Sequence, residues 1–183
     1  MSLVQVVLEV HRHLDGADRA HAFGGALALA HIAEPRGTVD IDVNVFSPMA
    51  EVGAVLEVFS AIDLVPERDP EHWFPRAGIR LRRAGDPVPV DVFPDLDDRY
   101  GEVRRRCVRH RFGPGGDRLP FLSAEDLTVF KLSFGRPQDW VDLRGIAGAR
   151  PQLDLDYVEE QLLALRGPQM YPRLARLRSL LRS

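Results

Sequence analysis

A short stretch of alternating apolar and acidic residues constrains the fold of this chain more than any other feature. From Thr38 to Phe46 the residues suit a β-strand, with valine or isoleucine at every second position from Val39 to residue 45. Because side chains alternate between the two faces of a strand, Asp40 and Asp42 are expected on the same face. The opposite face is apolar and suits a core. The stretch therefore predicts a half-buried strand with two neighbouring carboxylates.

These paired carboxylates have two explanations. Like charges this close repel each other unless a cation lies between them. Mg²⁺ prefers carboxylate oxygens and takes one or two of them while leaving positions for the phosphates of a substrate. A half-exposed strand with two solvated aspartates fits equally well, because charge on an edge strand prevents aggregation. The Asp-x-Asp pattern alone leaves both interpretations open.

A double glycine precedes this strand. Gly24 and Gly25 lie between a short predicted strand, 20–23, and an alanine-rich predicted helix, 26–32. Glycine has no Cβ, so a ligand can approach the backbone closely, and the unpaired N–H groups at a helix N-terminus attract anions. The turn suits a phosphate group, and a tight turn with no ligand is the alternative.

A third acid lies in a later predicted hairpin. The strands 79–83 and 88–93 are joined by a turn at 84–87. Valines of the second strand point one way and Asp91 points the other, as at Asp40 and Asp42. Asp91 is therefore a candidate third carboxylate, with an exposed edge residue as the alternative.

The rest of the chain is predicted to be largely helical. The expected helices are 3–14, 49–62 and 95–106, and one further strand is expected at 108–112. From Leu119 to the end the chain is predicted to be helical, with helices that include 153–165 and 171–181. Within that region, Ser123 resembles a helix N-cap and Asp126 its N3 acid. A candidate boundary lies near 113–119, so we expect one domain at 1–118 and a helical part at 119–183.

Composition limits the classes of function. The 45% hydrophobic content suffices for a core. No apolar run approaches the roughly 20 residues of a membrane span and no signal-peptide pattern is found, so we expect a cytoplasmic protein without a membrane partner. Cys107 is the single cysteine and cannot form an internal disulfide. The net charge of −3 gives no general sign of nucleic-acid binding.

Two basic features stand out. The densest cluster includes Arg104, Arg105, Arg109 and Arg111, which suits a phosphate backbone or a solvated surface. Of the 24 basic residues only Lys131 is a lysine, a compact point charge suited to phosphate. A lysine retained by chance is the alternative.

In this order, the features resemble the polymerase-beta-like nucleotidyltransferase superfamily. Its pattern is a glycine pair, an acid-hydrophobic-acid strand and a third acid on a later strand, matched here by Gly24, Gly25, Asp40, Asp42 and Asp91. The stretches 123–131 and 136–143 are similar to C-terminal motifs of the AbiEii-type toxin nucleotidyltransferases, in which a lysine and a following aspartate complete the site.

The resemblance implies a fold and a site. The fold is α+β, with a small mixed or antiparallel sheet flanked by helices and followed by a C-terminal helical bundle. The implied metal site for two Mg²⁺ ions consists of Asp40, Asp42 and Asp91, and Asp91 would join the metal directly or act as general base. Gly24 and Gly25 would hold the NTP phosphates, and Arg36 and Thr38 are close enough to contact phosphate or to fix the loop. Lys131 would neutralise the triphosphate, and Asp139 would be the distal acid. Spacing does not separate Asp139 from Asp142.

The resemblance also implies a function. We expect transfer of a nucleoside monophosphate from an NTP to RNA, with a tRNA 3′ end as acceptor, by the toxin of a toxin–antitoxin pair that has a cognate antitoxin. The alternatives are transfer to a small molecule such as an aminoglycoside, transfer to a protein side chain, and a non-catalytic nucleotide-binding module.

Overall fold

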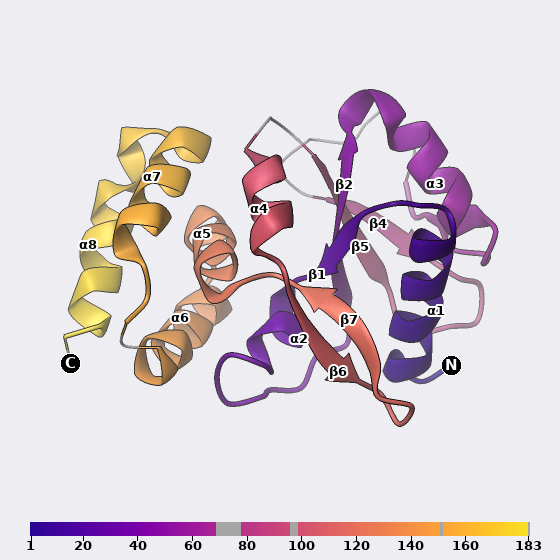
Figure 1. Ribbon diagram of the computed structural model, residues 1–183, viewed down its shortest axis with the longest axis horizontal. Helices are drawn as coiled ribbons and strands as arrows, with labels where there is room; N and C mark the ends of the chain where they lie inside the picture. Colours follow the sequence, from indigo (N-terminus) through magenta and orange to yellow (C-terminus); the bar gives the residue numbers. More distant parts are fainter. Residues whose placement is uncertain (69–77, 96–98, 151, 183) are drawn as a thin grey trace. The chain divides into compact units, whose positions relative to one another are not determined.

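The computed structural model describes residues 1–68, 78–95, 99–150 and 152–182 (Figure 1). The elements are α1 (Leu3–Gly16), β1 (His21–Phe23), α2 (Gly25–Leu29), β2 (Ile41–Pro48), η1 (Met49–Glu51), α3 (Val52–Ser60), β3 (Val65–Pro66), β4 (Ile79–Arg82), β5 (Val90–Asp95), α4 (Tyr100–Arg106), β6 (Val108–Phe112), β7 (Asp117–Phe121), α5 (Ala124–Phe134), α6 (Pro137–Ala149), α7 (Leu155–Arg166), η3 (Pro168–Met170) and α8 (Tyr171–Leu180). The predicted α+β class, with a sheet followed by helices, is confirmed.

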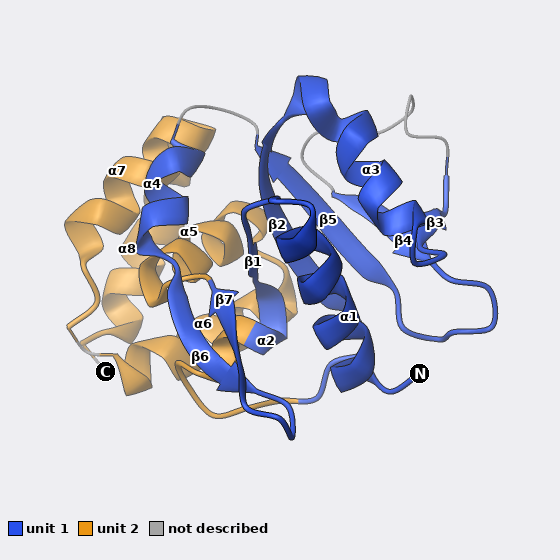
Figure 2. Ribbon diagram, turned by 45° about the vertical axis from the view of Figure 1, so that its right-hand side comes forward, with its two compact units in different colours: residues 1–27, 37–121 blue, residues 28–36, 122–183 orange. Residues whose placement is uncertain are grey.

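The chain forms two compact units, coloured separately in Figure 2. Unit 1 comprises residues 1–27 and 37–121, and unit 2 comprises residues 28–36 and 122–183. Each unit is therefore made from two separate segments of the chain. The sequence-based division into 1–118 and 119–183 stays a prediction about independent domains.

Unit 1 is built on one mixed sheet with the strand order β3-β4-β5-β2-β1-β7-β6. The pairs β2–β5 and β1–β7 are parallel, and the other neighbours are antiparallel. Helices α1 and α3 lie side by side against one face (Figures 1 and 2). The valines of β2 point to this face and are fully buried, as at Val43 and Val45. Their burial confirms the predicted apolar face of the strand.

Two strand boundaries differ from the prediction. Strand β2 begins at Ile41, so Asp40 precedes it, and Val39 is 79% exposed and does not join the apolar face. The Thr38 hydroxyl contacts the backbone of Asp40, a local interaction that competes with strand pairing. The prediction of helix from residue 119 onward is also wrong, because β7 continues to Phe121.

Later helix boundaries were easier to predict. Ser123 caps α5 by accepting a hydrogen bond from the Asp126 N–H at 3.1 Å, as predicted. The same helix ends at Gly135 in the left-handed conformation, with φ 66°. There Arg173 of α8 donates hydrogen bonds to the carbonyls of Leu132 and Ser133, which the helix itself leaves unpaired. Part of the predicted helix 95–106 and part of 64–78 lie outside the described residues.

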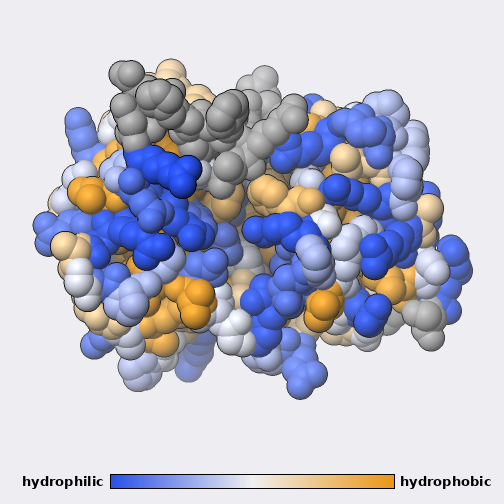
Figure 3. Space-filling view, turned by 180° about the vertical axis from the view of Figure 1, so that it is seen from behind, coloured by the Kyte–Doolittle hydropathy of each residue, from blue (hydrophilic) through white to orange (hydrophobic). Residues whose placement is uncertain are grey.

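The face of the molecule seen in Figure 3 is mostly polar where its residues are described. Figure 3 shows hydrophilic residues over much of one face, with hydrophobic residues in small groups among them. None of the described helices has the length and apolarity required to cross a membrane.

Candidate active site

Three neighbouring strands of unit 1 bring one basic and two acidic residues into a row. Asp42 of β2 is paired with Asp91 of β5, and Asp91 is paired with Arg80 of β4. Residues paired in this way point to the same face, and neighbouring strands lie about 4.8 Å apart. The row faces away from the apolar face of the sheet. The structure therefore brings two of the predicted carboxylates together.

Asp40 lies beside this row although it precedes strand β2. We call the three acids Asp40, Asp42 and Asp91 the acidic row. Its Oδ2 is 3.9 Å from Nη2 of Arg80, and its Oδ1 accepts a hydrogen bond of 2.6 Å from the Thr38 hydroxyl. Thr38 was predicted to contact phosphate or to fix the loop, and in this structure it holds the carboxylate of Asp40.

The double-glycine turn lies directly against Asp42. The Gly24 N–H donates to the Asp42 carbonyl at 2.9 Å, and Gly25 has φ +51°, a conformation that L side chains rarely adopt. A Cβ built on Gly25 would lie 1.7 Å from Oδ2 of Asp42. Only glycine leaves room for this carboxylate, so the turn and the acidic strand form one feature.

Arg80 is the cation of this site. Its Nε and Nη2 donate to the two oxygens of Asp91 at 2.8 and 2.6 Å. These hydrogen bonds raise the pKa of Arg80, so the guanidinium stays charged. Sequence reasoning missed Arg80. The predicted hairpin with its turn at 84–87 contained the signal, because that turn pairs residue 80 with residue 91.

The donor set suits a hard divalent cation. Asp40, Asp42 and Asp91 offer carboxylate oxygens, which are the protein ligands that Mg²⁺ prefers, and the Asp42 carboxylate fills the position that a Cβ of residue 25 would take. Among the described residues, no three acidic, histidine or cysteine side chains already converge on one point suited to a metal ion. Arg80 is the cation that now contacts Asp91.

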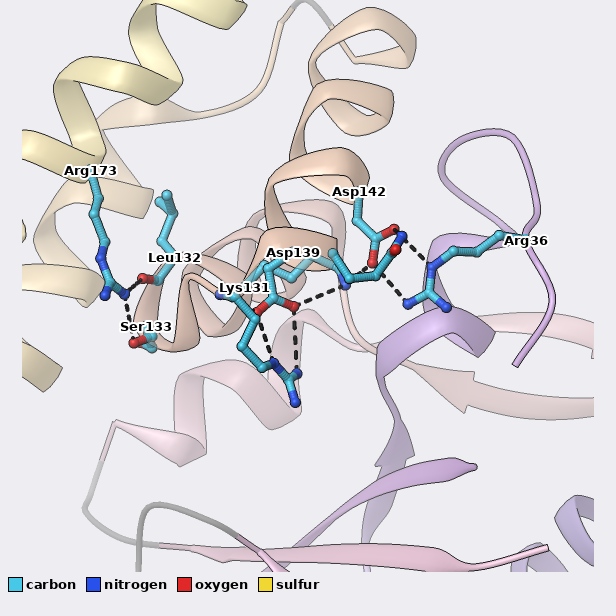
Figure 4. A network of polar contacts seen from close by, with 9 residues as sticks. Arg36, Lys131, Leu132, Ser133, Asp139, Asp142 and Arg173 are labelled. Atoms are coloured by element: carbon cyan, nitrogen blue, oxygen red, sulfur yellow. Dashed lines mark hydrogen bonds and ion pairs between the residues drawn. The ribbon is translucent and has the colours of Figure 1, made fainter. Parts of the chain in front are cut away.

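A second polar network lies in unit 2. Asp142 accepts hydrogen bonds from Lys131 at 2.5 Å and from Nε and Nη2 of Arg36 at 2.8 and 3.0 Å (Figure 4). Lys131 and Asp142 are buried. Gln138 adds a further bond to Asp142 at 3.1 Å. Arg36 and Lys131, both predicted to contact phosphate, share one carboxylate partner here, and their predicted phosphate roles stay predictions.

The two candidate distal acids have different partners. Asp139 accepts a hydrogen bond from the Arg136 N–H at 2.9 Å, which secures the start of α6, and its carboxylate is 3.8 Å from Lys131. Asp142 is the direct hydrogen-bond partner of Lys131. The choice of Asp139 for the catalytic role stays a prediction.

Asp142→Asn is expected to lower the free energy of unfolding by about 3 kcal/mol, because it leaves the buried Lys131 without its full counter-charge. Burial alone raises the pKa of Asp142, but hydrogen bonds from Arg36 and Lys131 outweigh it and the net pKa is lowered. The pair therefore stabilises the fold above about pH 4, and this contribution is lost as the pH falls through the folded-state pKa.

Urea unfolding of the wild type and of Asp142→Asn between pH 7 and pH 3 measures this. The variant should be less stable than the wild type at pH 7. Its free energy of unfolding should also fall less between pH 7 and pH 3 than that of the wild type. The exposed Asp156→Asn on α7 is the control, with an expected effect below about 1 kcal/mol. Equal stability of Asp142→Asn and wild type at pH 7 contradicts the prediction.

The predicted nucleic-acid residues are spread over α4 and β6 of unit 1. Arg104 and Arg105 lie on α4, and Arg105 pairs with Glu102. Arg109 and Arg111 are exposed on β6, and Arg111 is paired across the strands with Arg118. Like charges directly opposite each other are unfavourable, so this ribbon attracts anions. The role in RNA binding stays a prediction.

A pocket of about 250 Å³ lies next to this cluster. Its lining residues are Asp15, Asp18, Arg19, Ala20, His21, Phe46, Arg104, Cys107, Arg109 and Pro120. His21 begins β1 and the glycine turn follows the end of β1. The pocket and the acidic row therefore lie toward opposite ends of this strand.

His21 is buried at this pocket. Its Nδ1 is 2.8 Å from the Arg19 carbonyl, which can only accept, so Nδ1 carries the proton and Nε2 accepts from His11 at 2.8 Å. Burial is the main cause that lowers the pKa of His21 to about 4. The histidine is therefore neutral at pH 7.

This lowered pKa predicts a loss of stability in mild acid. The unfolded chain takes up the His21 proton near pH 6.5, whereas the folded chain does so only near pH 4. The free energy of unfolding should therefore fall by about 3 kcal/mol as the pH drops from 6.5 to 4. Urea unfolding across this range should show a shallower decline in His21→Gln than in the wild type or in the control His13→Gln. Identical slopes for all three proteins would show that His21 is not the group responsible.

No protein-family model and no curated protein sequence matches this chain. Solved structures do match. The chain is similar to the antibiotic-resistance factor ANT(2″)-Ia in complex with adenylyl-2″-tobramycin, with 16% identity, 92% of this chain and 99% of that chain covered, and a TM-score of 0.64. It is also similar to the lincosamide antibiotic adenylyltransferase LnuA bound to lincomycin, with 13% identity, 78% and 94% coverage and a TM-score of 0.56.

A third similar structure is an antigenic nucleotidyltransferase-like protein from Paracoccidioides brasiliensis. It has 19% identity, 98% of this chain and 92% of that chain covered, and a TM-score of 0.53. At these identities the likeness is one of fold.

Proposed function

We propose that this chain, whose fold is that of nucleotidyltransferases, transfers a nucleoside monophosphate from an NTP to a hydroxyl group of an acceptor. The observation that carries the proposal is the contact between the double-glycine turn and the acidic row. Gly25 lies so close to Asp42 that a Cβ has no space there, and Asp91 is the register partner of Asp42. A turn of two glycines, whose backbone no side chain of its own covers, thus lies beside carboxylates suited to Mg²⁺.

The residues have distinct roles in this reaction. Asp40, Asp42 and Asp91 would hold Mg²⁺, which when bound neutralises the triphosphate and favours deprotonation of the attacking hydroxyl. Gly24 and Gly25 admit the β- and γ-phosphates to the backbone. The acceptor oxygen bonds to the α-phosphorus, the bond from that phosphorus to the bridging oxygen breaks, and pyrophosphate leaves. Asp91 would help to activate the acceptor hydroxyl, either by holding the cation beside it or as the general base that accepts its proton.

Two classes of acceptor have support. A small hydroxyl-bearing molecule is favoured by the similar structures, since ANT(2″)-Ia was solved with an adenylylated aminoglycoside and LnuA with lincomycin. RNA, including a tRNA 3′ end, is favoured by the exposed arginines of β6, Arg109 and Arg111. In the RNA case the protein would act as a toxin with a cognate antitoxin.

The test is incubation of the protein and Mg²⁺ with each α-labelled NTP and one acceptor class at a time. Total tRNA, aminoglycosides, lincosamides and protein are compared for incorporated label, and release of pyrophosphate is followed in parallel. Label in one class identifies the acceptor. If no NTP binds in the presence of Mg²⁺, the proposal fails. NTP binding without transfer to any class instead supports a non-catalytic nucleotide-binding module.

A further inference from the structure

Arg80 neutralises the acidic row from within the sheet. Its planar guanidinium contacts both oxygens of Asp91, at 2.8 and 2.6 Å, in the two-bond geometry that makes arginine–carboxylate pairs strong. The nitrogen that contacts Asp91 at 2.6 Å, Nη2, also lies 3.9 Å from Asp40. One guanidinium therefore serves two of the three acids.

The three acids depend on Arg80 to different degrees. Asp40 also accepts a hydrogen bond from Thr38, and Asp42 lies against the glycine turn. Asp91 has the closest contact with Arg80, and both of its oxygens are engaged. A cation that approaches Asp91 therefore meets a carboxylate already occupied by a positive charge.

Arg80 is also placed to leave Asp91. Its side chain is 42% exposed, whereas that of Asp91 is 14% exposed. The guanidinium can therefore move into water on its flexible stem without opening the core. The fixed partner is the carboxylate, and the movable one is the arginine.

We propose that Arg80 is a positioning residue that competes with the divalent cation for Asp91. The guanidinium must leave this carboxylate before Asp91 can bind the cation of the nucleotide site. The physical reason is that the guanidinium and the divalent ion need the same oxygen lone pairs of Asp91, and two positive charges on one carboxylate repel each other. This inference rests on the proposed function. Without a divalent cation, Arg80 offsets the repulsion within the acidic row, and with one it is released toward solvent.

The experiment is a titration of the full chain with Mn²⁺, without NTP, followed by the electron paramagnetic resonance signal of the free ion. Arg80→Gln is expected to bind Mn²⁺ about tenfold more tightly than the wild type, because Asp91 is then free. Arg80→Lys keeps the charge but loses the fork, so an intermediate affinity is expected. This variant carries the test if Arg80→Gln does not fold.

Arg82→Gln is the matched control. Arg82 lies two residues further on the same strand, is also 42% exposed, and pairs with Glu67 at 3.1 Å. Its loss removes the same charge without releasing Asp91, so a change of less than about twofold is expected. An affinity in Arg80→Gln that is unchanged, weaker or equal to that of Arg82→Gln overturns the proposal.

Thermal unfolding gives a second readout. Without divalent cation, Arg80→Gln should melt at a lower temperature than the wild type, and Mg²⁺ should raise its melting temperature by a larger amount. Failure of the inference is distinguishable from failure of the proposed function. Wild-type Mn²⁺ binding that is lost in Asp42→Asn but unchanged in Arg80→Gln removes only the role of Arg80. Wild-type binding that Asp42→Asn leaves intact contradicts the site itself.

Discussion

Asp42→Asn should reduce nucleotidyl transfer by at least about 1,000-fold, the largest effect expected of any single substitution in this chain. Asp42 is the acid that lies against the glycine turn and beside Asp91 in the sheet. Asparagine has the same shape but removes the negative charge that would hold Mg²⁺ against the triphosphate. The measurement is the initial rate of label transfer from an α-labelled NTP to the identified acceptor.

Two control measurements show whether a loss of transfer in Asp42→Asn reflects the active site. Asp42→Asn should retain the melting temperature of the wild type within a few degrees, because the residue is only partly buried and the backbone bond from Gly24 remains. Asp18→Asn removes a carboxylate of unit 1 outside the acidic row and should leave transfer unchanged. Transfer in Asp42→Asn at a rate within tenfold of the wild type would move the active site elsewhere.

Gly25→Ala should abolish transfer nearly as completely, by at least about 100-fold. The new Cβ would lie 1.7 Å from Oδ2 of Asp42, so the carboxylate or the turn must move. Alanine at φ +51° adds a strain of about 1–2 kcal/mol, which lowers the melting temperature as well. Transfer rate, NTP affinity and thermal unfolding are measured on the same preparation.

Gly85→Ala separates strain from the clash. Gly85 also has a positive φ, +73°, but nothing lies within 4 Å of its Cβ position. Its substitution should cost similar stability and leave transfer intact. If Gly25→Ala and Gly85→Ala behave alike in both assays, the close approach to Asp42 has no role in the site.

Local patterns in the sequence predicted much of the fold. The hairpin of β4 and β5 forms where alternating apolar residues flank a turn, and α5 begins at its Ser123 cap. Strand β7 was missed because Pro120 lies within it and proline is rare in paired strands. Its pairing with β1 is recorded at a single position, Phe121 with Phe23, so the missing N–H of Pro120 leaves that pair intact.

The candidate site was predictable only in part. The strand pattern made Asp91 a candidate carboxylate, the resemblance to nucleotidyltransferases implied that it meets Asp42, and the two are register partners in the sheet. The partners of Lys131 were not predictable from spacing. Arg36 and Asp142 are 106 positions apart, and only the folded chain shows that they share one network with the lysine.

The crossing of the chain between its two units has a practical consequence for anyone who wishes to cut the protein in two. Residues 28–36 belong with residues 122–183, and Arg36 supplies two of the hydrogen bonds that hold Asp142. A fragment that ends at Phe121 contains residues 28–36 but not the rest of the unit to which they belong. The complementary fragment, 122–183, lacks Arg36, which donates to Asp142. Neither fragment should therefore fold completely when it is expressed alone. Mixing the two fragments should allow them to associate through residues 28–36.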